Sequence, residues 1–189
     1  MKDIAQKRGR PLKDNKNLST NIIINAAKSM MIENGKIPSI RAIATQLKVD
    51  PMALYYYFNN KNALLESITT SIMSDIQVPD DNEKWQQGLL ILCKSYLQTL
   101  NQFEGLLQIL LSMESNNPAK VFINKFKFII KSLNLNPKIE QDFLNILVDY
   151  LHGFSIAMSC DKKNTLTINQ IEKPLELLYG AIDLKIGQK

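Results

Sequence analysis

The chain is 189 residues long and carries 23 Lys and Arg residues against 18 Asp and Glu residues, a formal net charge of +5 at pH 7. This length allows one domain with a sizeable core, or a small domain joined to a larger one. The sequence shows no run of about eighteen apolar residues and no apolar segment near its basic start, which argues against a membrane span and a secretory signal and predicts a cytoplasmic protein. The two cysteines, Cys93 and Cys160, lie far apart, which excludes a disulfide framework and a zinc knuckle.

The positive charge is concentrated at the front of the chain. Residues 1–61 hold eleven Lys and Arg against four Asp and Glu, whereas residues 62–189 hold twelve against fourteen. This division predicts a segment that binds a polyanion, joined to a domain with another task. The stretch QKRGRPLK, residues 6–13, has four of the positive charges and no acid. Composition alone leaves open whether it is a working part or a solvated tail.

Every periodic segment has helical spacing, so we expect an all-α fold. The first helix is expected to begin at a Ser19 or Thr20 cap and to end at Gly35, which can adopt a positive φ. A short second helix follows a Ser39 cap.

A tight break leads into a third helix. Asp50 is expected to cap it and Pro51 to occupy its first position, which opens the segment PMALYYYF. Leu54 and Phe58 lie one turn apart and are expected to face the core.

Two short helices joined by a tight turn, the second beginning with a polar cap, have the geometry of a helix-turn-helix, whose second helix lies in the major groove of DNA. Another helix start stands at Asn60, and this fourth helix is expected to run to about residue 76. The break VPDDN, residues 78–82, then marks a natural domain hinge.

Residues 39–68, SIRAIATQLKVDPMALYYYFNNKNALLESI, resemble the TetR family of bacterial transcriptional regulators. Family members show an Ile-Arg-x-Ile-Ala first helix, a Val in the turn, a Leu-Tyr-x-(Tyr/His)-Phe ending to the recognition helix, and a Lys followed closely by Leu-Leu. The matching positions here are Arg41, Val49, Leu54, Tyr55, Tyr57, Phe58, Lys61, Leu64 and Leu65. The chain departs from the family at Lys48, where glycine is common.

The resemblance implies a DNA-binding domain over residues 17–64, with a connecting helix that begins there and spans 61–76, preceded by a flexible basic arm, residues 1–16. In the family, residues at the start of the recognition helix face bases, and tyrosines and a lysine contact phosphates or base edges. The implied DNA contacts in the domain are Ser39, Arg41, Met52, Ala53, Tyr55, Tyr56, Tyr57 and Lys61.

The arm also has a motif of its own. Gly-Arg-Pro flanked by basic residues is the core of an AT-hook, whose arginines, here Arg8 and Arg10, enter the narrow minor groove of A·T-rich DNA. About ten residues separate Arg10 from the first helix, and at roughly 3.3 Å each they can reach a neighbouring groove. We therefore expect an arm that becomes ordered on DNA. The alternative is a tail that only raises non-specific affinity.

Residues 77–189 are expected to form a larger helical domain, which brings the total to about nine helices. The expected helical segments are about 83–103, 105–114, 118–133, 138–159 and 168–186. TetR-like regulators place a ligand pocket in this domain and dimerise through its last two helices. The resemblance therefore implies a homodimer through about 138–159 and 168–186. The apolar stripe expected to remain partly exposed in a monomer comprises Ile139, Phe143, Ile146, Leu147, Tyr150, Phe154, Ile171, Leu175, Leu178 and Ile182.

Candidates for the pocket are aromatic, methionine and histidine side chains of this domain: Tyr96, Phe103, Met113, Phe122, Phe126, Tyr150 and His152. Residues of these types at helical spacing serve equally as plain core. His152, the only histidine, is expected to be a satisfied core or interface residue rather than a metal ligand or base.

The sequence offers no catalytic constellation. It has one histidine, no CxxC, no phosphate-binding G-x-x-x-x-G-K and no G-x-S-x-G, so we expect no enzyme, no metal site and no cofactor. The expected function is a repressor that binds a palindromic double-stranded DNA operator as a dimer, has no membrane contact, and is released by a small apolar or aromatic effector. The alternative is a nucleoid or cell-division factor of the same fold without a small-molecule inducer. A cavity in the larger domain would favour the first, and a closed domain the second.

Overall fold

The computed structural model describes residues 18–80 and 83–186. Over these residues the chain is all-helical, which confirms the predicted fold class. The elements are α1 (Thr20–Asn34), α2 (Ile40–Leu47), α3 (Pro51–Leu54), α4 (Lys61–Ser74), α5 (Trp85–Gln102), α6 (Leu106–Ser112), α7 (Asn117–Ile130), the 3₁₀ turn η1 (Lys131–Leu133), α8 (Pro137–Cys160), the 3₁₀ turn η2 (Ile168–Ile171) and α9 (Glu172–Ile186).

Capping residues set the helix starts in the first third of the chain. The Ser19 hydroxyl accepts a hydrogen bond from the backbone N–H of Ile22 at 3.3 Å, and the Asn60 side-chain oxygen accepts one from Ala63 at 2.8 Å. Each bond satisfies an N–H that has no partner within the helix. Gly35 closes α1 with a φ of 62°. The predicted caps of α1 and α4 are therefore confirmed.

The third helix is shorter than the segment PMALYYYF predicts, because α3 ends at Leu54. The next residues continue as a tighter turn: Tyr55 N–H bonds the Met52 carbonyl at 3.2 Å, three residues back, and Tyr57 N–H bonds the Leu54 carbonyl at 3.0 Å. Leu54 and Phe58 are buried, as predicted. The tyrosines thus leave the helix in a turn whose two ends are fixed by core residues.

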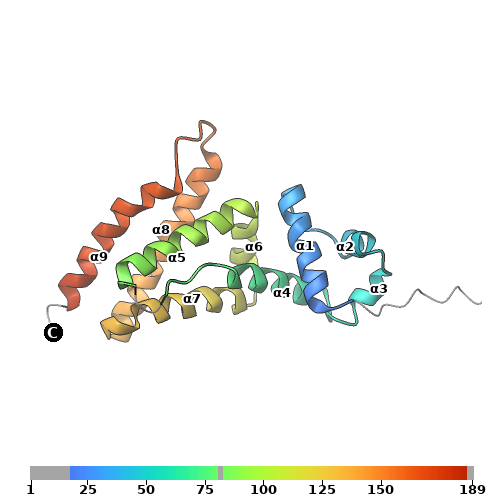
Figure 1. Ribbon diagram of the computed structural model, residues 1–189, viewed down its shortest axis with the longest axis horizontal. Helices are drawn as coiled ribbons and strands as arrows, with labels where there is room; N and C mark the ends of the chain where they lie inside the picture. Colours follow the sequence, from blue (N-terminus) through green and yellow to red (C-terminus); the bar gives the residue numbers. More distant parts are fainter. Residues whose placement is uncertain (1–17, 81–82, 187–189) are drawn as a thin grey trace, which may run out of the picture.

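The helices form two groups joined by α4. Figure 1 shows α1, α2 and α3 at one end of an elongated molecule, the larger group from α5 to α9 at the other, and α4 running between them. On one side α4 packs against α1, and on the other it packs chiefly against α7. Its buried Ile68 and Ile72 belong to the same apolar cluster as Ile23 of α1 and Phe126 of α7. The connecting helix is therefore part of the core of both groups, and the predicted domain boundary after it stays a prediction.

Helix α8 is the longest and one of the most apolar elements of the described chain. By length and composition alone this 24-residue helix could cross a membrane, and 22% of its apolar window is buried. The sequence has no uninterrupted run of about eighteen apolar residues, and α8 is no exception, because Asp142, Asn145 and Asp149 interrupt it. A core helix of a folded protein passes the same test, and α8 buries Phe143, Leu147 and Leu151 in the apolar core.

Candidate nucleic-acid interface and candidate ligand pocket

Residues 39–58 form a helix-turn-helix. The Ser39 hydroxyl caps α2 by accepting a hydrogen bond from Ala42 N–H at 3.1 Å, and the Asp50 carboxylate caps α3 by accepting one from Met52 N–H at 2.8 Å. Between them Lys48 adopts a φ of 56° and ends α2 in the left-handed region. This is the conformation for which glycine is the usual residue, so the chain makes the same turn at a cost on the order of 1 kcal/mol.

Most of the predicted DNA contacts are exposed at this end of the molecule. Arg41 lies on the surface of α2, and Lys61 is the first residue of α4. Met52 exposes 65% of its surface and Tyr56 exposes 89%, which are high values for large apolar and aromatic side chains. Tyr55 is exposed as well. The segment thus presents a cation, aromatic rings and a thioether to the solvent without a partner in the described chain.

Ala53 and Tyr57 depart from the expected arrangement. Ala53 is predicted to face bases, but only 5% of it is exposed, because its position on α3 points into the domain beside Leu54. Tyr57 is partly exposed, and its hydroxyl donates a hydrogen bond to the Leu18 carbonyl at 2.7 Å, just before α1. The structure therefore places Ala53 among the packing residues and gives Tyr57 a structural bond. The predicted minor-groove residues Arg8 and Arg10 lie outside the described residues.

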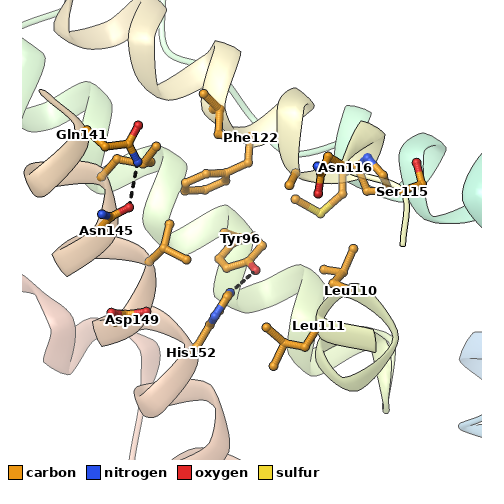
Figure 2. Close-up of a pocket in the computed structure, with 16 residues that line it drawn as sticks. Tyr96, Leu110, Leu111, Ser115, Asn116, Phe122, Gln141, Asn145, Asp149 and His152 are labelled. Carbon is orange, nitrogen blue, oxygen red and sulfur yellow. Dashed lines mark hydrogen bonds between the residues drawn. The ribbon is translucent and has the colours of Figure 1, made fainter. Parts of the chain in front are cut away.

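A cavity of about 380 Å³ lies in the larger group of helices. Its wall combines Met73 of α4, Tyr96 of α5, residues of α6 and α7, and one face of α8 (Figure 2). The lining residues are Met73, Tyr96, Leu110, Leu111, Ser115, Asn116, Pro118, Ala119, Phe122, Ile123, Gln141, Leu144, Asn145, Val148, Asp149 and His152. A cavity of this size accommodates a small organic molecule.

Two hydrogen-bonded pairs order the polar part of the cavity wall. The Tyr96 hydroxyl and His152 Nε2 lie 2.8 Å apart, and the Gln141 side-chain N–H₂ donates to Asn145 Oδ1 at 2.8 Å (Figure 2). Burial lowers the pKa of His152, while the nearby charge of Asp149 opposes the shift. Burial also raises the pKa of Tyr96 well above its usual value. The pair is therefore uncharged near neutral pH.

The structure brings only some of the predicted pocket residues together. Tyr96, Phe122 and His152 line the cavity. Phe103 and Phe126 are buried in the core away from it. The other two candidates also lie outside its wall: the Met113 sulfur accepts a hydrogen bond from Thr69, and the Tyr150 ring packs against Phe154 with the centroids 6.1 Å apart.

The sequence reasoning found His152 but missed three other polar residues of α8 that line the cavity, Gln141, Asn145 and Asp149. Together with His152 they recur at spacings of four, four and three residues, which places them on one side of a helix. This spacing could have identified them, because a polar stripe on an otherwise apolar helix indicates that this face lines a site with polar groups. Within residues 18–80 and 83–186, no group of three or more His, Cys, Asp or Glu side chains could hold a metal ion.

Comparisons with known proteins agree with this arrangement. Residues 23–68 match the family model of bacterial regulatory proteins of the tetR family. The tetracycline repressor protein class A from transposon 1721 of Escherichia coli is 31% identical over 87 residues. That match covers 44% of this chain and 40% of the repressor's length, so the likeness in sequence extends over less than half of either protein.

Solved structures share the fold at low sequence identity. Apo ActR from Streptomyces coelicolor matches with a TM-score of 0.74 at 16% identity, covering 90% of this chain and 97% of ActR. BioQ bound to its double-stranded DNA operator matches with a TM-score of 0.68 at 18% identity, covering 88% and 98%. A TetR variant from Acinetobacter baumannii AYE bound to minocycline matches with a TM-score of 0.70 at 21% identity, covering 88% and 97%. The described chain has the fold of these proteins, and residues 23–68, which include its helix-turn-helix, match the tetR family of bacterial regulatory proteins.

Proposed function

We propose that this protein is a DNA-binding transcriptional regulator and not an enzyme: a cytoplasmic repressor that binds a palindromic operator as a homodimer and is released by a small effector. The observation that carries the proposal is the position of α4. The helix begins at Lys61 beside the helix-turn-helix and contributes Met73 to the cavity wall. Lys61 and Met73 are twelve residue steps apart along the helix, about 18 Å at 1.5 Å per residue. One rigid element thus links the candidate DNA contacts to the candidate effector site.

The effector would act by favouring one position of α4 over another. A ligand can shift such an equilibrium only by the difference between its affinities for the two conformers. Binding of operator DNA by BioQ and of minocycline by the TetR variant supports this assignment by analogy of fold. The cavity favours a ligand-responsive regulator over a nucleoid or cell-division factor without an inducer.

The proposed dimer rests on apolar surface that the protomer leaves uncovered on α8 and α9. On α9, Leu177 and Leu184 expose 79% and 70% of their surface, and both fall on one stripe with exposed Gly180 and Ala181. On α8, Ile146 exposes 56% and shares its stripe with exposed Gly153. A Cβ at Gly153 or Gly180 would meet no atom within 4 Å, so a second helix could approach both closely.

This stripe differs from the one expected from the sequence. Of the residues expected there, Phe143, Leu147, Ile171, Leu175 and Ile182 are buried inside the protomer. The uncovered apolar side chains lie beside them on the same two helices. A two-fold pairing through these faces would place two helix-turn-helix units on one operator, as a palindrome requires.

The experiment that tests the function is a selection of bound fragments from sheared DNA of the source genome, repeated at several salt concentrations. The proposal expects one or a few palindromic fragments that persist as salt rises. Fragments without a shared site, with binding that collapses in salt, would indicate a general DNA binder and reject the operator-specific repressor.

Variants of the recognition segment and of the arm sharpen this test. Arg41→Ala and Tyr55→Ala are expected to weaken operator binding strongly, and unchanged binding in both would reject these DNA contacts. Deletion of residues 1–13 is expected to lower affinity most for sites with A·T-rich flanks. An equal loss on all flanks would leave the arm as general positive charge.

A further inference from the structure

The cavity wall carries one formal charge. Of the 16 residues that line it, Asp149 is the only Asp, Glu, Lys or Arg, and Figure 2 shows it on α8 between Asn145 and His152. The rest of the wall is chiefly apolar, with Leu110, Leu111, Ile123, Leu144 and Val148 among its residues. An apolar chamber with a single negative charge discriminates between ligands by the sign of their charge.

The Asp149 carboxylate has no ion-pair or hydrogen-bond partner among the described residues. The ion pairs of that part of the chain are Lys28–Asp75, Lys94–Glu172 and Lys127–Glu140, none of which includes Asp149. Its polar neighbours on the same helix face, Gln141 and Asn145, bond to each other. Asp149 is exposed, and no cation of the described residues pairs with it, so its carboxylate is free to pair with a bound cation.

The aromatic side chains of the wall favour the same sign of charge. The rings of Tyr96 and Phe122 lie with their centroids 4.8 Å apart and tilted by 50°. The face of an aromatic ring attracts a cation and repels an anion. Burial keeps the Tyr96 phenol protonated by raising its pKa and keeps His152 neutral by lowering its pKa, so neither group changes the charge of the wall near neutral pH.

We infer that the effector of this cavity is a lipophilic organic cation, an amine or onium compound whose charge lies beside Asp149 and whose apolar part packs against Phe122 and the leucines of α6. The inference rests on the proposed function only in treating the cavity as the effector site. An anion of the same shape would lose its hydration and meet the carboxylate without any cation in the wall to offset either cost. We therefore expect carboxylate, sulfonate and phosphate ligands to bind less tightly than a cation of the same shape.

Two probes of matched shape test the sign of the charge. Tetraphenylphosphonium and tetraphenylborate both carry four phenyl groups on a tetrahedral centre and differ in charge. Isothermal titration calorimetry with the full-length protein is expected to show binding of the phosphonium and little binding of the borate. Asp149→Asn should weaken the phosphonium about fivefold, the upper end expected for an exposed charge pair.

Two further variants place the site. Asp142→Asn removes the same charge from a position of α8 that is equally exposed but outside the cavity wall, and it should leave phosphonium affinity within about twofold of the wild type, because its distance from the bound cation is larger and solvent screens it. Leu111→Trp adds bulk to the cavity wall from a residue that is 63% exposed, and it should abolish binding. Unchanged binding in Leu111→Trp would put the phosphonium elsewhere and overturn the inference.

The remaining outcomes are equally decisive. The inference would be overturned by any of three results: borate binding as tight as phosphonium binding, an equal loss of phosphonium affinity in Asp142→Asn and Asp149→Asn, or no phosphonium binding at all. Binding of the selected genomic fragment, measured by fluorescence anisotropy on the same preparation, separates the two proposals. DNA binding without phosphonium binding rejects the cation alone, whereas absence of specific DNA binding rejects the proposed function.

Discussion

Lys48 holds a backbone conformation that carries a penalty for any residue with a Cβ. Its φ of 56° costs on the order of 1 kcal/mol, whereas glycine adopts this region freely. Lys48→Gly is therefore expected to raise the free energy of unfolding by about 0.5 kcal/mol, after the larger entropy of glycine in the unfolded chain is subtracted. Urea unfolding measures the change. Lys48→Ala is the control that removes the charge and keeps the Cβ, and an equal gain in both variants would contradict the backbone explanation.

The neighbouring residues Tyr56 and Tyr57 differ in role. Tyr57 makes a hydrogen bond within the protein, and Tyr56 makes none with the described residues and is exposed to solvent. The Tyr57 hydroxyl donates to the Leu18 carbonyl at 2.7 Å, and Tyr56 is 89% exposed. Tyr57→Phe should lower the free energy of unfolding by about 0.5–1.5 kcal/mol, and Tyr56→Phe should leave it unchanged. Thermal unfolding of both variants checks this pair. A stable Tyr57→Phe would mean that the bond contributes nothing to holding the start of α1.

His152 makes stability depend on pH in a defined direction. Burial lowers its pKa below 6.5, so the unfolded chain binds the proton more readily than the folded chain. The free energy of unfolding should therefore fall as the pH drops through about 6.5, and this loss should level off below the folded-state pKa. Urea unfolding between about pH 7.5 and pH 5 measures the slope, and His152→Gln should flatten it. Because the chain has one histidine, identical slopes in both proteins would refute the assignment.

At the scale of the element, the C-terminal end of α4 is held by lysines from two other helices. Lys125 of α7 donates to the carbonyls of Ser74, at 2.8 Å, and Ile76, and Lys28 of α1 pairs with Asp75. The two Lys125 bonds satisfy carbonyls at and just after the end of the helix, where no helical N–H can reach them. Together with the Lys28 pair, they also connect the connecting helix to both groups of helices at one point.

Loss of the Lys125 ammonium should destabilise the protein, because the carbonyls of Ser74 and Ile76 lose their hydrogen-bond donor. Lys125→Met is expected to lower the free energy of unfolding by about 1–2 kcal/mol, because it keeps most of the side-chain packing and loses the charged donor. Lys120→Met on the same helix is the matched control, since Lys120 is exposed and outside this cap. Chemical denaturation compares the two variants. Equal effects would show that the lysine acts only through general charge.

The elements themselves could largely be predicted from the sequence, because their signals are local. Ser19, Ser39, Asp50 and Asn60 cap the helices they were expected to cap, and each needs only an N–H two or three residues away. The early end of α3 could not be predicted, because it depends on how deeply Leu54 and Phe58 pack. The cavity could not be predicted either: Phe103 and Phe126 have the same residue type and helical spacing as Phe122, and only tertiary packing separates core from cavity wall.

At the scale of the whole molecule, the uncovered stripes of α8 and α9 predict the oligomeric state. Leu177→Lys would place a charge in the centre of the proposed helix pairing and is expected to convert the dimer to monomer and to abolish operator binding. Sedimentation velocity measures the first effect and fluorescence anisotropy the second. Val78→Lys, an exposed apolar position in the loop before α5, is the control that should remain dimeric. A dimeric Leu177→Lys variant would reject this face as the interface.

The cavity and the helix-turn-helix share no residue, and α4 runs from one to the other, with Lys61 at one end and Met73 near the other. Substitutions in the wall therefore leave the predicted DNA contacts unchanged, provided that the packing of α4 is kept. The family match is confined to residues 23–68, whereas the fold of the described chain is shared with solved structures at 15–21% identity. A molecule built in this way can change the chemistry of its cavity wall and keep the exposed surface of its helix-turn-helix.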